Sequence, residues 1–249
     1  ISLEQLMNAH IEQPLVGPPV VNVLALNMAL DKDIIAQKVM GQGQRAAWVI
    51  SQPEIGGVKL HAPEYASWPL EKRIAEAKKL LAEAGFGPEH PLSLNLLYNT
   101  FETHQRIAIA ASSMWKKNLG VEAKLQNQEW KTMLDTMHTG NFDVVRYAWI
   151  ADYDDASSFL NIFRTGDSEN TTKYSNPAFD EAMRNAAKAN SLEERGKYYQ
   201  QAEDLLGDDV PAIPVYHYVR THLVKPWVGG FAPDNRGNYY TKDMYIKKH

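Results

Sequence analysis

The sequence predicts an α/β fold in which helices cover a sheet whose strands are joined by crossover connections. Two observations predict it. Between residues 92 and 149, short apolar runs of strand length alternate with longer segments in which apolar residues recur every three or four positions. Glycine, proline and capping residues stand at the ends of these segments. Strands that alternate with helices in this way are typical of a layered α/β sheet.

The N-terminal part contains a segment that fits no regular element, followed by two helices. Residues 1–23 include PLVGPPV, whose prolines favour an extended linker. From Leu24, the run LALNMALDKDIIAQKVM places its apolar side chains on one face, which predicts a helix. A second helix is expected to begin near Pro69 and to end at Gly85, because glycine commonly terminates helices.

The alternating region and the segments after it complete the prediction. Strands are expected at 92–98, 121–128 and 142–149, and helices at 102–120 and 129–138. Two later helices carry start signals: Asn176 as N-cap before Pro177, and a capping box made by Ser191 and Glu194. A strand over 210–219 contains two prolines, which place it at a sheet edge or at a crossing between lobes.

Composition excludes several classes of function. With a net charge of −4 and no basic stripe, the chain is not expected to bind nucleic acid. It contains no cysteine, which rules out disulfides and thiolate chemistry and fits an exported protein. No run of 18 apolar residues is present, so no membrane span is expected. The chain opens at Ile1 without a signal peptide, which leads us to expect a mature, processed or cut product.

Motifs for enzymatic chemistry are missing as well. The sequence has no nucleophile elbow, no phosphate loop and no H-E-x-x-H zinc motif. The acidic stretch WIADYDD (149–155) does not continue as a calcium loop, because Ser157 and Phe163 stand where glycine and glutamate are required. We therefore predict no metal site and no cofactor. A glycoside hydrolase with a pair of catalytic carboxylates stays an open alternative, because the distance between two carboxyl groups cannot be read from the sequence.

Three aspartates in this stretch have different expected roles. Asp154 and Asp155 precede ASSFLNIF, a segment with helical periodicity, so capping of a helix start is the favoured interpretation for both. Asp152 lies between the end of a strand and this cap, beside Trp149 and Tyr153. A partly desolvated carboxylate at that position could face a cleft.

Long blocks of the sequence resemble a known family. NLLYNTFETHQRIAIAASSMWKKNLGV, LQNQEWKTMLDT, GNFDVVRYAWIADYDDASSFLN, PVYHYVRTHLVKPWVGGF and the terminal MYIKKH resemble periplasmic oligopeptide-binding proteins, solute-binding family 5, close to the murein-peptide-binding branch. The resemblance runs from about Leu24 to His249 and excludes the first twenty or so residues. It implies a lobe of the periplasmic-binding-protein type II kind, a mixed sheet flanked by helices, together with a hinge strand and part of the other lobe.

The resemblance also implies a domain organisation. Members of the family are much longer than this chain, and the part present resembles their C-terminal half. Residues 1–23 stay unassigned, 24–219 correspond to the second large α/β lobe, and 220–249 to the hinge return and a C-terminal contribution to the first lobe. The missing N-terminal half would be the main structural partner.

By resemblance, the function is binding of short peptides in extended form between two closing lobes, without catalysis. The receptor would work in the periplasm and deliver peptides to an inner-membrane ABC permease. Asp152 would receive the α-ammonium group of the peptide, which is the one charge that every linear peptide shares. Trp149 would form a pocket wall, although burial in the core is an equally good interpretation of this residue.

Three more residues are candidates for the ligand site. By resemblance, Arg146 and His104 line the cleft and meet a ligand carboxylate, and Tyr218 places a hydroxyl near the ligand. From the residues alone, His104 is better explained as a solvated histidine at a helix start, and sheet packing explains Tyr218 equally well.

Two departures from the family bear on specificity. Met40 and Met137 stand where relatives carry lysine and arginine, respectively. Both changes remove positive charge, so we expect a preference shifted away from acidic or murein-type ligands and toward longer or more apolar peptides. Two other functions stay open: an acid–base enzyme on the same scaffold, and an isolated lobe that acts as a protein-interaction module.

Overall fold

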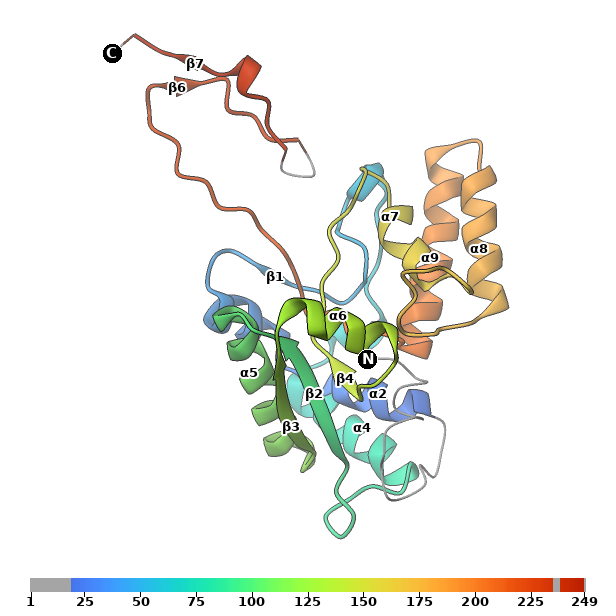
Figure 1. The fold of residues 1–249 in the computed structure, drawn as a ribbon. Coiled ribbons are helices and arrows are strands. Elements are labelled where there is room, and N and C mark those ends of the chain that lie inside the picture. Colours follow the sequence, from blue (N-terminus) through green and yellow to red (C-terminus); the bar gives the residue numbers. More distant parts are fainter. Residues whose placement is uncertain (1–18, 235–237, 249) are drawn as a thin grey trace.

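A parallel sheet lies at the centre of the fold (Figure 1), in a computed structural model that describes residues 19–234 and 238–248. It contains β2 (Ser93–Asn99), β3 (Glu122–Gln128) and β4 (Val144–Val145) in the order β3–β2–β4. The register places Leu96 beside Leu125 on one side and beside Val144 on the other. Both pairings are parallel, which requires a crossover connection before each new strand.

The connections are the helices that the sequence predicts. Helix α5 (Glu102–Leu119) joins β2 to β3, and α6 (Trp130–His138) joins β3 to β4. Successive side chains of a strand point to opposite faces of the sheet, and β2 follows this rule. Its residues Leu94, Leu96 and Tyr98 pack with α5, α2 and α4, whereas Leu97 packs with α6. The α/β prediction with crossover helices is confirmed.

The N-terminal helices differ in extent from the prediction. Helix α2 (Pro19–Met28) begins before the expected start at Leu24, because proline fits the first turn of a helix, where its missing N–H is not needed. The rest of the predicted linker, up to residue 18, lies outside the described residues. The apolar stripe does not form one continuous helix. Asp31 accepts a hydrogen bond from the backbone nitrogen of Ile34 (3.0 Å) and starts a new one.

The new segment consists of α3 (Lys32–Ile34) and a π-helical turn, Ile35–Met40, that ends at Gly41 in the left-handed region (φ 68°). Helix α4 (Leu70–Glu83) follows and packs against α2. It matches the predicted helix between Pro69 and Gly85.

Two buried cations enclose Trp48. The Nζ atom of Lys32 lies 3.8 Å from the centre of the Trp48 ring, and the guanidinium carbon of Arg73 lies 4.7 Å from it. Lys32 also donates to the carbonyl of Ala47 (3.1 Å), and burial together with nearby Arg73 lowers its pKa well below the ordinary value. Arg73 donates to the carbonyl of Met28 (3.4 Å), the last residue of α2, and to that of Leu30 (3.1 Å). These contacts fix the segment around Trp48 to the N-terminal helices.

An antiparallel strand pair joins distant parts of the chain. Strand β1 (Arg45–Ala46) pairs with β5 (Tyr216–His217), and Arg45 lies opposite His217. The strand predicted over 210–219 is therefore reduced to one short pair, because its prolines cannot donate to a ladder. This pair forms its own sheet, so among the described residues the central sheet contains only parallel pairings.

The remaining helices form a layer beside the central sheet. Helix α7 (Ser157–Leu160) continues into a 3₁₀ turn, Asn161–Phe163, and is followed by α8 (Pro177–Lys188) and α9 (Leu192–Asp209). The predicted caps are confirmed: Asn176 accepts from the backbone nitrogen of Ala178 (2.9 Å), and Ser191 accepts from that of Glu194 (3.1 Å). The Glu194 carboxylate accepts a hydrogen bond from the backbone nitrogen of Asn190 (3.1 Å) and not from that of Ser191, so the capping box is shifted by one residue.

After β5 the chain leaves the main body as an extended arm (Figure 1, orange to red). The arm carries the antiparallel pair β6 (Val228–Gly229) and β7 (Tyr245–Ile246). Leu223, Trp227 and Ile246 are exposed on it, which leaves apolar surface without a covering layer among the described residues. Within the described part of the chain, no helix is both long and apolar enough to cross a membrane.

Candidate functional site

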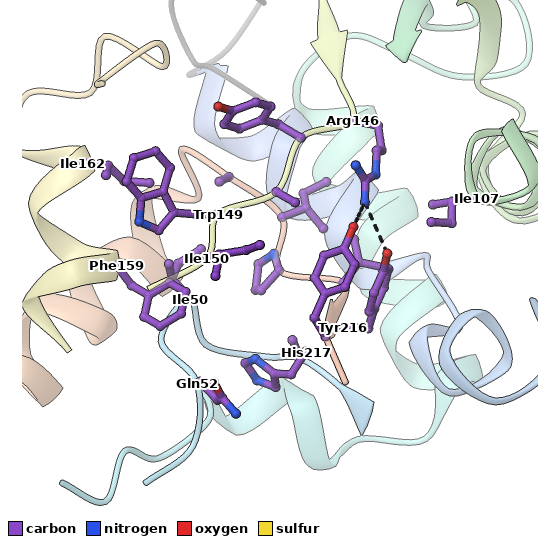
Figure 2. Close-up of a pocket in the computed structure, with 18 of the residues that line it drawn as sticks. Ile50, Gln52, Ile107, Arg146, Trp149, Ile150, Phe159, Ile162, Tyr216 and His217 are labelled. Atoms are coloured by element: carbon purple, nitrogen blue, oxygen red, sulfur yellow. Dashed lines mark hydrogen bonds between the residues drawn. The ribbon is translucent and has the colours of Figure 1, made fainter. Parts of the chain in front are cut away.

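A pocket of about 660 Å³ opens at the carboxyl end of β4 (Figure 2). Its lining includes the residues that follow β4, the segment around Ile50 and Gln52, and the neighbourhood of β5, together with residues of α5 and α7. Its wall is mostly apolar and includes Ile50, Trp149, Ile150, Phe159 and Ile162. In open α/β sheets, ligands bind outside the carboxyl ends of the strands, so the pocket occupies the expected place for a ligand site.

The strand predicted over 142–149 ends early, and the residues that follow it form one wall of the pocket. Only Val144 and Val145 pair in β4, and the backbone nitrogen of Arg146 adds one more bond to the carbonyl of Leu97 (2.7 Å). Beyond this bond the chain leaves the sheet, so residues 146–151 line the pocket instead of extending the strand.

Arg146 is the main polar feature at this end of the pocket. Its guanidinium donates hydrogen bonds to the hydroxyls of Tyr216 (3.3 Å) and Tyr218, drawn as dashed lines in Figure 2. Burial, with the hydrogen bond to Tyr218, raises the pKa of Tyr216 above its ordinary value, so this phenol is neutral. None of the ion pairs among the described residues involves Arg146. Its positive charge therefore faces the pocket without an acidic partner from the described chain.

Trp149 belongs both to the pocket wall and to the core. Its indole nitrogen donates to the carbonyl of Ser158 (2.7 Å), and the ring is half-buried against the cluster that contains Phe159 and Leu160. One face of the side chain is thus packed, and the residue also lines the pocket.

Asp152 lies on the loop that continues from the pocket wall. Ile150 and Ala151 line the pocket, whereas Asp152 itself is exposed and does not line it. Its backbone nitrogen donates to the hydroxyl of Ser158 (2.8 Å), which holds the loop in place. The role of its carboxylate stays a prediction.

The other two aspartates have separate structural roles. Asp155 accepts from the backbone nitrogen of Ser157 (2.9 Å), the first residue of α7, so it satisfies a free amide at this helix start as predicted, although Ala156 is the N-cap residue. Burial opposes its charged form, but hydrogen bonds from Ser157, Tyr199 and Arg195 lower its pKa below the ordinary value. The carboxylate of Asp154 accepts from the backbone nitrogen of Gly56 (2.9 Å), a residue 98 positions away. Its predicted capping role stays a prediction.

His104 lies near Arg146 but does not line the pocket. Its Nδ1 atom donates to the side-chain oxygen of Asn99 (2.6 Å), and the ring contacts Phe101 at the start of α5. Burial, together with the charge of Arg146, lowers the pKa of His104 to about 4. The imidazole is therefore neutral at neutral pH.

The two methionines that depart from the family have different positions. Met137 is buried in α6 with Leu97 and Met133, and it lines the pocket. Met40 is half-buried at the end of the π-helical turn and does not line the pocket. Only Met137 therefore adds to the apolar character of the pocket itself.

Sequence reasoning missed several lining residues. Tyr216, His217, Gln52 and Ile50 all line the pocket, yet none was predicted as a site residue. The alternating aromatic and polar residues of VYHY gave a signal for Tyr216 and His217, but no motif marks the segment that contains Ile50. The described residues contain no group of acidic or histidine side chains arranged to hold a metal ion.

An α/β lobe with a ligand-sized pocket at the carboxyl end of its sheet is the architecture of the type II periplasmic binding proteins. Residues 23–171 match the family described as bacterial extracellular solute-binding proteins, family 5 Middle, and the chain belongs to this family. The family resemblance and the fold class inferred from the sequence are both confirmed.

Individual relatives support the assignment. The chain is 51% identical over 226 residues to the periplasmic oligopeptide-binding protein OppA of Escherichia coli strain K12, and 43% identical over 227 residues to the periplasmic murein peptide-binding protein MppA of the same strain. These alignments cover 90% and 91% of this chain and 42% of each relative. The chain therefore spans less than half the length of these curated relatives.

Solved structures show the same relation. The structure of the Escherichia coli murein tripeptide binding protein MppA matches with a TM-score of 0.84 at 42% identity, covering 92% of this chain and 45% of that one. Haemophilus influenzae OppA in complex with RPPGFSPFR matches with a TM-score of 0.82 at 40% identity, covering 96% of this chain and 46% of that one.

Proposed function

We propose that this chain is one lobe of a peptide receptor that closes on short, extended peptides and delivers them to an inner-membrane ABC importer. Residues 24–219 form the second large lobe, and residues 220–249 form the hinge return and a contribution to the first lobe. The receptor works in the periplasm and does not catalyse a reaction. The names of the relatives OppA and MppA support this assignment.

The observation that carries the proposal is the combination of an apolar pocket with one cation that has no acidic partner in the described chain. A pocket of about 660 Å³ is large enough for a few amino-acid side chains. The guanidinium of Arg146 is held by two phenolic hydroxyls, which orient it without cancelling its charge. A ligand carboxylate would supply the missing opposite charge through the planar donor fork of arginine.

The other site residues receive complementary roles. Asp152 binds the α-ammonium group of the peptide from the loop beside the pocket, once closure brings the ligand against it. Trp149 forms the apolar wall, and the hydroxyl of Tyr218 positions Arg146 beside the ligand. His104 contributes to the carboxylate end through its proximity to Arg146.

The exposed side chains of the C-terminal arm favour the existence of a second lobe that contacts it. Leu223, Trp227 and Ile246 expose apolar side chains on an arm that extends from the main body (Figure 1). Apolar surface of this kind is typical of a contact with another domain. The partner we propose is the N-terminal half of the receptor, which would cover the arm and complete the cleft.

Isothermal titration calorimetry with the full-length receptor tests the function. A tripeptide should bind, and its N-acetylated form should be rejected. Asp152→Ala should lower the affinity about a hundredfold or more, since about 1.4 kcal/mol corresponds to one decade. Asp135→Ala, on the exposed surface of α6, is the matched control and should bind as the wild type does. Equal affinity for capped and uncapped peptides would refute the role of Asp152.

Two further measurements separate the alternatives. Mass spectrometry of the peptide recovered after incubation should show it intact, whereas cleavage would indicate an enzyme on this scaffold. Size-exclusion chromatography of the 249-residue chain distinguishes a monomer from an oligomer that forms through the exposed arm. A stable oligomer that binds no peptide would favour the interaction module.

The composition of the pocket also supports the expected specificity. Met137 places an apolar side chain in the wall. We therefore propose that apolar peptides bind more tightly than murein tripeptide. The same calorimetry with both ligands tests this, and tightest binding of murein tripeptide would contradict it.

A further inference from the structure

The pocket has a second polar corner, formed by Gln52 and His217. Both side chains line the pocket, and Figure 2 draws them at its lower edge. Neither side chain forms a hydrogen bond or ion pair with another described residue. Polar side chains that line an apolar pocket without protein partners are available to a ligand.

Both residues are held in place by backbone contacts. His217 belongs to β5 and lies opposite Arg45 of β1 in the antiparallel register. The carbonyl of Gln52 accepts a hydrogen bond from the backbone nitrogen of Ile55 (3.2 Å). The preceding residue, Ser51, is fixed through its backbone nitrogen to the carboxylate of Glu203 (2.8 Å). The corner is therefore formed before a ligand arrives, which lowers the entropic cost of using it.

Both side chains of the corner are uncharged at neutral pH. Burial, with the nearby cations Arg45 and Lys32, lowers the pKa of His217 to about 4, so the imidazole carries one N–H donor and one nitrogen acceptor at neutral pH. The amide of Gln52 adds two donors and one acceptor. A group that both donates and accepts satisfies this set best. A carboxylate offers no donor for the imidazole acceptor, and an ammonium group offers no acceptor for the N–H donors of the imidazole and the amide.

We propose that the corner formed by Gln52 and His217 is a specificity subsite for a neutral ligand side chain that both donates and accepts hydrogen bonds, namely a carboxamide. It selects a glutamine or asparagine side chain over an aliphatic one and rejects a basic one. This subsite rests on the proposed peptide-binding function and adds a sequence preference to it. Discrimination arises because an aliphatic side chain would cover both polar groups and leave them unpaired.

The test uses the full-length receptor and tri-alanine peptides in which glutamine, leucine, glutamate or lysine replaces each alanine in turn. Calorimetry should find one position at which the glutamine peptide binds about tenfold more tightly than the leucine peptide, the effect of one net hydrogen bond. The double variant Gln52→Leu/His217→Phe should bring these two peptides to the same affinity. Gln126→Leu and His61→Phe change the same residue types at exposed sites and should keep the preference.

The outcomes separate this inference from the proposed function. If none of the peptides binds the wild type, the proposed function fails. If peptides bind but glutamine is never preferred to leucine, or glutamate binds most tightly, the carboxamide subsite is refuted and the peptide-binding function stands. A preference that survives in the double variant also refutes it. Thermal unfolding checks that the double variant is folded. If the double variant does not fold, the single variant Gln52→Leu is used in its place.

Discussion

The buried carboxylate of Glu203 accepts a hydrogen bond from the backbone nitrogen of Ser51, 2.8 Å away and 152 positions earlier in the chain. Its other oxygen accepts from the backbone nitrogen of Ile50 (2.9 Å). Burial raises the pKa of Glu203 above its ordinary value, and the two amides offset part of that cost by stabilising the charged form. One side chain of α9 thereby fixes the segment that carries Ile50 into the pocket wall.

Removal of this carboxylate should destabilise the protein and loosen the pocket. Glu203→Ala leaves the amides of half-buried Ile50 and buried Ser51 without acceptors, so we expect the free energy of unfolding to fall by about 2–4 kcal/mol. Glu203→Gln keeps one acceptor and should cost less, while peptide affinity falls in both variants. Urea denaturation and calorimetry measure the two effects.

The control lies on the same helix. Glu193 forms an exposed ion pair with Lys197 (2.9 Å), and Glu193→Ala should leave both stability and affinity unchanged. Equal loss in the Glu193 and Glu203 variants would contradict a specific role of the buried carboxylate.

A second link between distant segments depends on the absence of a side chain at Gly56. Its φ is +59°, and a Cβ atom there would lie 3.1 Å from the carbonyl oxygen of Asp154 and from the Cα of Asp155. Gly56→Ala should therefore lower the free energy of unfolding by about 1–3 kcal/mol, through backbone strain and the displaced contact.

Gly87→Ala provides the comparison, because a Cβ atom at Gly87 has no neighbour within 4 Å and the backbone is not left-handed. Thermal unfolding should show little change for this variant. A Gly56 variant as stable as the Gly87 variant would show that the loop carrying Asp154 adapts without cost.

The central elements could be predicted because their signals are local. The helix expected over 102–120 is observed as Glu102–Leu119, and it ends where Gly120 adopts a φ of 74°. The strand expected over 92–98 is observed as Ser93–Asn99. In both cases apolar periodicity and a stop residue determine the element with no need for tertiary contacts.

The site could be predicted only in part, because its geometry depends on contacts between segments far apart in the sequence. Nothing near Ile50 indicates that Glu203 will hold it, and nothing near Asp154 indicates that its carboxylate will bind the backbone of Gly56. The early end of the strand at Val145, which turns residues 146–151 into a pocket wall, also lacked a local signal. Arg146, Trp149 and Tyr218 were identified through family resemblance and do line the pocket.

Arg146 should determine the preference for a free peptide carboxylate. In the full-length receptor, a tripeptide acid should bind about tenfold or more tightly than its C-terminal amide, because the guanidinium is held by hydroxyls and not by an acid. Arg146→Met should remove this difference, and Arg146→Lys should restore part of it. Arg106→Met, on the exposed surface of α5, should retain the wild-type ratio. An unchanged acid-to-amide ratio in Arg146→Met would place the carboxylate elsewhere.

His104 and His217 should make the folded protein sensitive to mild acid. Burial lowers the pKa of each from 6.5 to about 4, with Arg146 adding to the effect at His104 and the cations Arg45 and Lys32 at His217. The unfolded chain therefore binds protons more readily than the folded protein, so the stabilising contribution is full above pH 6.5 and is lost as the pH falls toward 4.

Between about pH 7 and pH 5 His217 should cost about 1–2 kcal/mol of unfolding free energy, and the less buried His104 should cost less, because solvent screens its interactions. His104→Gln and His217→Gln should each flatten the pH dependence measured by urea denaturation, whereas His61→Gln and His90→Gln, at exposed positions, should leave it as in the wild type. Asp155 also loses stabilisation in acid, since hydrogen bonds lower its pKa, so the difference between variant and wild type isolates the histidines. Parallel curves for all five proteins would mean that both imidazoles are protonated in the folded state, with Arg146 and Arg45 too well solvated to oppose it.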